Sequence, residues 1–427
     1  MAVQGHKRLS ICYIVLGHDL LSSAGPTRNV LYLAEALSQW AEVTVAFRKV
    51  LEPIAPRGYK VVEIAPGMDH DTRSRVDDAA VRGMSLRSFM AYLRSVRQFL
   101  EAHRCDYDMV LEKSWLLSGY VTAYCRRLGL PAVVVENIVR LWNEPLQSPQ
   151  DMIRYGRHQL AQMLVGHYLR HAPLIIAETA ELKTALTHRW RIPARRIQVV
   201  GLGVNRQLFR PMDQAEARRE LGIAPDATVL LYAGVLDPTH NLTPLLEALR
   251  EVACPTLHLH IVGHGVLGNL YETQARESCS PVSFHGRVPH AAIPRYIAAA
   301  DVCLAPYDPA MFPNRQVAYA TLKIPEYMVS ARPVISVPSG HILKLVQDGV
   351  SGFLFPNEVA YWRDFLRTCP SRAQLRHMGR AARQTVPVWS WDEVARTYFR
   401  LCQYAVMHTR QDDAGMVQHH DASLYEP

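Results

Sequence analysis

The sequence has no apolar run long enough to cross a bilayer, which takes about 18 residues. Its longest apolar runs, Ala172–Ala177 and Val229–Leu236, are far shorter, so we expect no transmembrane helix. Low-complexity tracts and short-period repeats are also missing, and 49% of the residues are hydrophobic against 20% charged. This composition excludes a disordered or collagen-like chain. With 427 residues, the chain is long enough for two or three globular domains.

The eight cysteines form no CxxC pair and have no histidine at zinc-finger spacing. Single, scattered cysteines in a chain of this length are typical of a reduced, cytoplasmic protein. Near the start, basic residues His6–Arg8 precede the apolar stretch Leu9–Gly17, an order that imitates a secretion signal. Because that stretch is only nine residues long and His18-Asp19 closes it, we expect a first buried strand and a cytoplasmic location.

Basic residues are in excess only in the first half of the chain. Residues 1–204 contain 26 Lys and Arg against 18 Asp and Glu, a net charge of +8, and the remainder holds 21 of each kind. A one-sided basic field indicates an anionic partner, such as a membrane surface or a phosphorylated acceptor. A generally basic proteome is the alternative. Because arginines and aromatic residues do not alternate on one face, we expect no nucleic-acid partner.

Short β-rich apolar runs alternate with helical patterns along most of the chain. Strands buried on both faces and interleaved with helices are typical of parallel sheets built from βαβ units. The pattern restarts after Gly201–Pro211, where two glycines and a proline interrupt it. We therefore expect an α/β protein with two Rossmann-like, doubly wound parallel-sheet domains. The expected ranges are 1–200 for the first domain, 201–385 for the second, 386–406 for a helix that crosses back, and 407–427 for a flexible tail.

Residues Ser85–Arg104 have the pattern of a basic amphipathic helix. Its arginines lie away from an apolar stripe, which packs on the sheet of its own domain in the interpretation that we favour. Adhesion to anionic lipid, in keeping with a lipid-linked acceptor, is the alternative. The apolar stripe consists of Leu86, Phe89, Met90, Leu93, Val96 and Leu100.

The second half carries a family resemblance. Thr321–Glu358 reads TLKIPEYMVSARPVISVPSGHILKLVQDGVSGFLFPNE and resembles the donor-binding region of retaining GT-B glycosyltransferases, particularly glycosyltransferase family 4 (glycosyl transferases group 1). Five further segments agree in order and spacing, so that the resemblance covers about 199–401 closely and 9–45 weakly. They are IQVVGLGVNRQLFRP, LLYAGVLDPTHNLTPLLEAL, LHIVGHG, VSFHGRVPHAAIPRYIAAADVCLAPY and VWSWDEVARTYFRL.

The resemblance implies a GT-B fold, whose two domains face an interdomain cleft. It also implies that a sugar passes from a nucleotide diphosphate sugar, bound mostly to the second domain, to a hydroxyl-bearing acceptor on the first. We expect retention, a role in glycan, polysaccharide or glycoconjugate biosynthesis, and no cofactor. No acidic cluster offers metal ligands at the diphosphate, so we expect metal independence. The alternatives are a non-catalytic GT-B module that binds phosphorylated lipid or a protein partner, and a nucleotide-sugar epimerase of the same fold.

Lys323 and Glu326 are three residues apart on one face of a short helix that Thr321 would cap. An ammonium beside a helix N-terminus neutralises a diphosphate leaving group. A carboxylate one turn on accepts hydrogen bonds from a ribose diol. An exposed Lys–Glu ion pair is the alternative, but the flanking apolar residues predict a mostly buried helix.

The resemblance extends the donor site to several loops, although this sequence departs from the family pattern in two places. Ala318 stands where relatives often carry a sugar-binding Glu, and Val235 and Asn241 lie where they tend to have Arg and Lys. Gly263 and Gly265 allow close backbone approach to a ligand or, alternatively, form a tight turn without one. The further donor-binding candidates are Gly234, Arg287, Val288, Leu322 and Gly340.

The first half supplies candidates for the acceptor and for catalysis. Glu136 follows an apolar run at the position where relatives often carry a His that contacts the transferred sugar, and Glu112 ends another run. A carboxylate there would accept the acceptor's proton or stabilise oxocarbenium-like charge, whereas a cap or a surface ion pair is the alternative role. The resemblance adds four residues to the acceptor side: His18, Gly25, Arg28 and Asn137.

Overall fold

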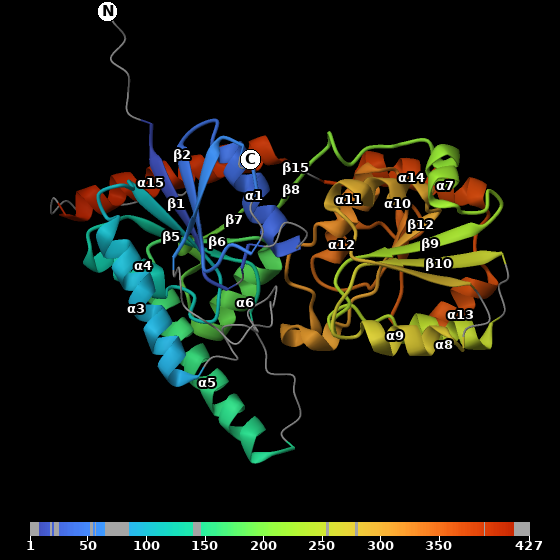
Figure 1. The fold of residues 1–427 in the computed structure, drawn as a ribbon, viewed down its shortest axis with the longest axis horizontal. Coiled ribbons are helices and arrows are strands. Elements are labelled where there is room, and N and C mark those ends of the chain that lie inside the picture. The colour runs from blue at the N-terminus through green and yellow to red at the C-terminus, as the bar shows by residue number, and fades with distance from the viewer. Residues whose placement is uncertain are drawn as a thin grey trace, which may run out of the picture. The chain divides into compact units, whose positions relative to one another are not determined.

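A computed structural model describes residues 8–17, 19–20, 25–51, 54–55, 57–64, 85–139, 147–252, 256–277, 281–387 and 389–413. The chain forms two compact units (Figure 1): Met1–Gly201 with Trp391–Pro427, and Leu202–Ser390. The boundaries expected from the sequence, 200 and 385, lie close to these. The expected tail begins at Met407, but helix α15 (Trp391–Asp413) continues beyond that residue.

The first unit is built on a parallel sheet with the strand order β3-β2-β1-β4-β5-β6-β7. Its central strands are buried almost throughout, since helices cover both faces, and this explains their continuous apolar sequence. The strands are β1 (Ser10–Val15), β2 (Glu42–Phe47), β3 (Tyr59–Glu63), β4 (Met109–Lys113), β5 (Ala132–Glu136), β6 (Ile175–Ala177) and β7 (Ile197–Val199).

The helices of the first unit pack through apolar faces. Val96 and Leu100 join the core around Ile14, so the C-terminal half of the Ser85–Arg104 helix packs on its own sheet, as we expected. Helix α15 returns to this unit, where Trp391 stacks on Tyr32 with ring centroids 5.7 Å apart. The other helices are α1 (Gly25–Leu37), α3 (Leu86–Ala102), α4 (Tyr120–Arg127), α5 (Pro149–His171) and α6 (Ala180–Trp190).

The second unit repeats the design, with a parallel sheet of order β11-β10-β9-β12-β13-β14. Its strands are β9 (Thr228–Ala233), β10 (Leu257–Val262), β11 (Val282–Gly286), β12 (Val302–Ala305), β13 (Val334–Ser336) and β14 (Gly352–Leu354). A separate parallel pair joins β8 (Gly203–Val204) to β15 (Trp389–Ser390). Together the two sheets confirm the doubly wound α/β architecture predicted from the alternating pattern.

Two apolar clusters cover the faces of this second sheet. Ile297, Tyr327 and Ala382 belong to the cluster on one face, whereas Leu246 and Trp362 belong to the cluster on the other. The helices are α7 (Gln214–Leu221), α8 (Thr243–Glu251), α9 (Gly268–Ala275), α10 (Ile293–Ala299), α11 (Lys323–Val329), α12 (Ile342–Leu345), α13 (Val359–Arg367) and α14 (Arg372–Thr385). Among the described residues, no helix of either unit has the length and hydropathy that a bilayer span requires.

Candidate active site

The strand order of the second unit defines where a ligand binds. Strands β9, β10 and β11 follow one another toward one edge, and β12, β13 and β14 toward the other. The connections therefore diverge between β9 and β12, and open α/β sheets bind ligands beyond the carboxyl ends of the strands at such a point. Gly234 follows β9 there, and Tyr307 lies two residues beyond β12.

Lys323 reaches this switch point from the first residue of α11. Its ammonium nitrogen lies 4.4 Å from the Tyr232 ring centroid and 5.7 Å from that of Tyr307. The same nitrogen lies 3.3 Å from the Tyr232 hydroxyl oxygen, to which it donates a hydrogen bond. Two aromatic faces thus hold the cation at the carboxyl ends of β9 and β12.

Gly234 leaves the space that Lys323 occupies. A Cβ built on Gly234 would stand 2.6 Å from the Lys323 ammonium nitrogen, and the residue has φ +159°. Any side chain at this position would displace the lysine. The sequence predicted both residues as donor-binding without showing that each depends on the other.

Thr321 does not cap α11, and this expectation is wrong. The residue before the helix is Leu322, and it makes no capping hydrogen bond through its side chain. Thr321 is buried, and its hydroxyl oxygen accepts a 2.6 Å hydrogen bond from the Tyr307 hydroxyl. Thr321 therefore fixes the Tyr307 ring beside Lys323 instead of closing the helix.

The loop after β9 places a half-buried carboxylate near Lys323. Burial raises the pKa of Asp237, but a 2.9 Å hydrogen bond and the charge of His240, with a further bond from Thr239, lower this pKa to about 2. Burial and the charge of Lys323 lower the pKa of His240 to about 4. At neutral pH, Asp237 is an anion held by a neutral histidine.

Lys323 and Glu326 both have shifted pKa values. Burial lowers the pKa of Lys323 to about 7, against the attraction of Asp237 and Glu326. Burial raises the pKa of Glu326 to about 8, against the attraction of Lys323. Among the described residues, the Glu326 carboxyl group makes no hydrogen bond and no ion pair. Shifted titratable groups at a switch point are typical of a functional site.

Gly263 and Gly265 serve the packing of two loops. A Cβ on Gly263 would stand 1.8 Å from the Gly234 carbonyl oxygen, and one on Gly265 would stand 2.1 Å from that of Leu236. The backbone N–H of Gly263 donates to the Gly286 carbonyl at 2.8 Å. Both glycines are therefore required for the close packing of these loops, and their donor-binding role stays a prediction.

The donor-binding candidate Gly340 uses its backbone N–H within the protein, and its donor-binding role stays a prediction. This group donates to the Gln316 side-chain oxygen at 2.9 Å. The residue has φ +54°, and an added Cβ would stand 2.3 Å from the Val317 carbonyl oxygen. Gly340 is required for this turn to pack against the 316–317 segment.

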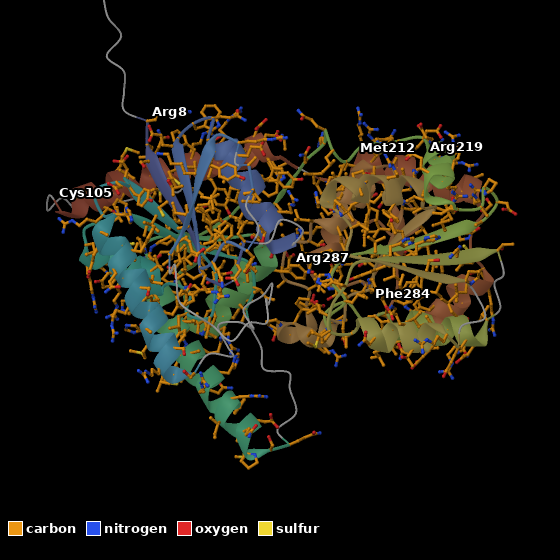
Figure 2. All side chains as sticks on the ribbon, in the orientation of Figure 1. Arg8, Cys105, Met212, Arg219, Phe284 and Arg287 are labelled. Carbon is orange, nitrogen blue, oxygen red and sulfur yellow. The ribbon has the colours of Figure 1, made fainter. Side chains whose placement is uncertain are left out.

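The donor-binding candidates Arg287 and Val288 follow the end of β11. Arg287 is exposed (Figure 2), and its guanidinium group lies in hydrogen-bonding contact with His264 of the neighbouring loop. Val288 packs partly buried against the apolar core. The donor-binding role of these two residues and of Leu322 stays a prediction.

Sequence reasoning missed four members of the second unit's site: Tyr232, Tyr307, Asp237 and His240. From the sequence, the two tyrosines are indistinguishable from core residues, because each lies near the end of an apolar run that forms a strand. Asp237 and His240 occupy the loop between Val235 and Asn241, the two positions at which this sequence departs from the family pattern. A charged residue three positions after a glycine that ends a strand is the signal that could have found Asp237.

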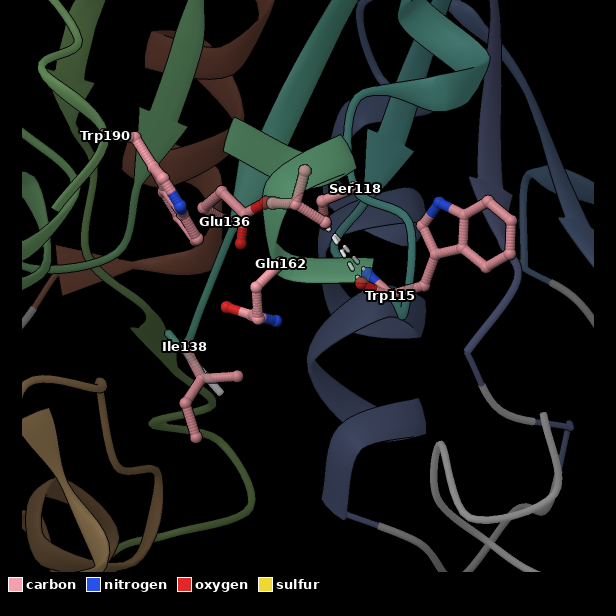
Figure 3. Close-up of a pocket in the computed structure, with 7 residues that line it drawn as sticks. Trp115, Ser118, Glu136, Ile138, Gln162 and Trp190 are labelled. Carbon is pink, nitrogen blue, oxygen red and sulfur yellow. Dashed lines mark hydrogen bonds between the residues drawn. The ribbon is translucent and has the colours of Figure 1, made fainter. Parts of the chain in front are cut away.

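In the first unit, Glu136 ends β5 and is buried beside a small cavity (Figure 3). The cavity has a volume of about 10 Å³, which is room for about one water molecule. Gln162, Trp190 and Ser118 also line it. Asn137 lies at the same sheet edge, where its side-chain oxygen accepts a hydrogen bond from Ser114. The catalytic role of Glu136 stays a prediction.

Glu112 has a structural role instead of the expected catalytic one. Its buried carboxylate accepts hydrogen bonds from Trp115 Nε1 at 2.9 Å and from the Gly119 N–H at 2.8 Å. The backbone N–H and the hydroxyl of Thr122 also donate to it, each at 2.8 Å. The carboxylate thus closes the N-terminus of α4, the capping role that we weighed against catalysis.

The remaining acceptor-side candidates lie around the start of α1. Gly25 is the first residue of this helix, and Arg28 lies in its first turn. The Nε of Arg28 is buried, and among the described residues it has no hydrogen-bond partner. Such an atom suits an anionic ligand. His18 lies outside the described residues.

The strand orders and the switch-point site define the class of the protein. Two doubly wound parallel sheets in tandem, with a cation and a carboxyl group at the switch point of the second, are the plan of GT-B transferases. A family model described as Glycosyltransferase Family 4 matches residues 24–208, and another described as Glycosyl transferases group 1 matches residues 227–368. The chain therefore belongs to the family 4, group 1 glycosyltransferases and is an enzyme. This identification decides against the non-catalytic module and the epimerase.

Curated relatives carry the name D-inositol 3-phosphate glycosyltransferase. The protein from Nocardioides sp. is 27% identical over 68% of this chain and 66% of its own length. The one from Frankia alni is 26% identical over 88% of this chain and 94% of its own length.

Solved structures share the GT-B fold. Sucrose-phosphate synthase from Thermosynechococcus elongatus superposes with a TM-score of 0.73 at 20% identity, covering 94% of this chain and 100% of that one. Anabaena HepE, in complex with UDP and glucose, superposes with a TM-score of 0.66 at 19% identity, covering 93% and 100%.

Proposed function

We propose that this glycosyltransferase uses a nucleotide diphosphate sugar, with uracil as its base, and transfers the sugar with retention to a hydroxyl group. The observation that carries the proposal is the position of Lys323, a cation held between two aromatic rings at the sheet's switch point. The uracil base is suggested by HepE, a fold neighbour in complex with UDP.

In this reaction the bond between the anomeric carbon and the diphosphate oxygen breaks, and the acceptor oxygen forms the new bond to that carbon. The nucleoside diphosphate leaves with the bonding electron pair, and the acceptor hydroxyl gives up its proton. Lys323 would neutralise the negative charge that develops on the leaving group, which is the most costly charge of the step. Glu326 would accept hydrogen bonds from the ribose diol.

The acceptor is proposed to bind at the carboxyl edge of the first unit's sheet. Glu136 would stabilise positive charge on the donor sugar or accept the proton of the acceptor hydroxyl. Arg28, whose Nε is buried and unpaired among the described residues, would bind an anionic group of the acceptor. A phosphorylated or lipid-linked alcohol, used in glycan, polysaccharide or glycoconjugate synthesis, offers both the hydroxyl group for the transfer and the anionic group for Arg28.

Thermal denaturation with UDP, GDP, ADP and phosphate tests the donor assignment. A ligand that binds only the folded state raises the melting temperature, and the rise grows with the logarithm of the ligand concentration divided by its Kd. We expect UDP to stabilise the protein most, and Lys323→Ala to remove that effect. If no nucleotide changes the melting temperature, the donor site is wrongly assigned. The anomeric configuration of the product, measured by NMR, tests retention separately.

A further inference from the structure

Helix α5 of the first unit has two halves with opposite surroundings. Its C-terminal half packs on the unit through Ala161, Val165 and Leu169, all buried. A Cβ on Gly166 in this half would stand 2.5 Å from the Trp190 ring, so the helix is seated closely there. The N-terminal half extends away from the rest of the unit (Figure 1).

The N-terminal half and the residues just after it expose large apolar side chains. Met152, Ile153, Leu160 and Met163 are between 59% and 72% exposed. At 3.6 residues per turn, these four residues fall within an arc of about 100°, on the side opposite to the buried residues. We call this stripe the outer face of α5. Such a contiguous apolar stripe on a water-exposed helix marks an interaction surface.

Helix α3 adds to the same surface region of the unit. Arg97 of α3 bonds to the Tyr120 hydroxyl at 2.5 Å, and Tyr168 of α5 lies edge-on to the Tyr120 ring. The two helices therefore flank one tyrosine. In the first turns of α3, Leu86 and Met90 are 70% and 53% exposed.

The charge of this region is strongly positive. Ser85–Arg104 and Ser148–His171 together contain seven arginines and only two acidic residues, Glu101 and Asp151. By the same periodicity, Arg157 and Arg170 are exposed at the edges of the outer face, whereas Arg154 lies on the opposite side of the helix and pairs with Asp151 at 3.6 Å. Positive charge beside an exposed apolar stripe complements a surface that carries phosphate groups over hydrocarbon.

We propose that the outer face of α5 binds the surface of a bilayer that contains anionic lipid, with its apolar side chains among the acyl chains and its arginines at the phosphates. A second copy of this chain is the other partner that an exposed apolar helix suggests. Two such faces would bring arginines of the same charge together, and this opposes pairing. The proposal does not depend on the transfer reaction, because α5 carries none of the donor-site residues.

Vesicle flotation with the full-length protein tests this inference. We expect binding to phosphatidylcholine vesicles that contain about 30% phosphatidylglycerol, weaker binding to phosphatidylcholine alone, and a loss of binding at high salt. Met152→Gln with Met163→Gln lowers the partition coefficient by about tenfold for each side chain. Arg157→Gln with Arg170→Gln lowers it by about fivefold for each charge.

Matched controls come from the second unit. Met212 and Arg219 are exposed there (Figure 2), and Met212→Gln and Arg219→Gln leave vesicle binding unchanged. All variants keep the melting shift caused by UDP, whereas Lys323→Ala loses that shift and keeps vesicle binding. If the α5 variants float as well as the parent, the proposal is wrong. A second outcome would also contradict the proposal: the parent protein does not bind anionic vesicles, and light scattering shows dimers that the α5 substitutions dissociate.

Discussion

The ammonium nitrogen of Lys323 lies 2.6 Å from the point where a Cβ on Gly234 would stand. The glycine follows β9 and the lysine begins α11, so this contact lies at the switch point between β9 and β12. A cation in that position is available to a ligand at the carboxyl edge. Five predictions follow from the site and its surroundings.

Gly234→Ala should weaken UDP binding by at least about tenfold, since the new methyl group pushes the ammonium out of its place between the tyrosine rings. Isothermal titration measures this loss. Gly156→Ala is the matched control, because nothing lies within 4 Å of a Cβ built there in the middle of α5. That variant should stabilise the fold by about 0.5–1 kcal/mol and bind UDP normally. Normal UDP affinity in Gly234→Ala would contradict the contact.

Lys323→Ala should reduce kcat/KM by at least about a hundredfold, as expected for the loss of a charge that stabilises a developing oxyanion. Steady-state kinetics with a UDP-sugar donor measures the effect. Lys344→Ala removes the other lysine of the second unit, an exposed residue of α12, and should leave the rate unchanged. If Lys323→Ala and Lys344→Ala both keep the kcat/KM of the parent, Lys323 has no part in the reaction.

The affinity for UDP should fall as the pH rises from about 6 to about 9. Lys323 has a pKa of about 7 and loses its charge in this range. Glu326, with a pKa of about 8, ionises in the same range and becomes the better acceptor for the ribose diol, so its titration opposes part of this loss. Asp237 and His240, with pKa values of about 2 and about 4, keep their charge states.

Titration calorimetry in buffers of different ionisation enthalpy checks this linkage by counting the protons taken up. Lys323→Arg keeps its charge throughout, so its UDP affinity should vary less with pH than that of the parent. A parent affinity that stays constant from about pH 6 to about pH 9 would show that neither group titrates in the free site.

Glu112→Gln should lower the free energy of unfolding by about 2 kcal/mol, because the amide replaces one acceptor of a buried, fully bonded carboxylate with a donor. Urea denaturation measures this change. UDP binding by the second unit should be unaffected. If the variant is as stable as the parent but inactive, Glu112 acts in catalysis instead of capping α4.

Treatment with EDTA should leave the rate of sugar transfer unchanged, since Lys323 is proposed to neutralise the diphosphate without a divalent cation. The rate is measured before and after chelation, and again after Mg²⁺ is restored. Loss of activity that Mg²⁺ restores would overturn the expectation of metal independence. Among the described residues, no group of three or more His, Cys, Asp and Glu side chains has the arrangement of a metal site.

The parallel sheets could be predicted because their central strands are buried on both faces and are therefore continuous apolar runs. β12, expected at Val302–Ala305, has these bounds in the structure. β3 was missed because its residues are only partly buried, so its sequence lacks such a run. α5 was missed because only its second half packs on the unit, and Gly156 interrupts its helical pattern.

The sequence by itself determined the alternation of strands and helices in two successive parallel sheets and the spacing of Lys323 and Glu326, since both depend on local periodicity. It did not determine the partners of the candidate carboxylates, because Glu112 and Glu136 each end an apolar strand. Only the tertiary structure decided that Glu112 receives the N–H groups of α4 whereas Glu136 lines a cavity. Likewise, Tyr232 is 91 residues from Lys323 in the chain, and only the packing of α11 against β9 brings its ring beneath the ammonium.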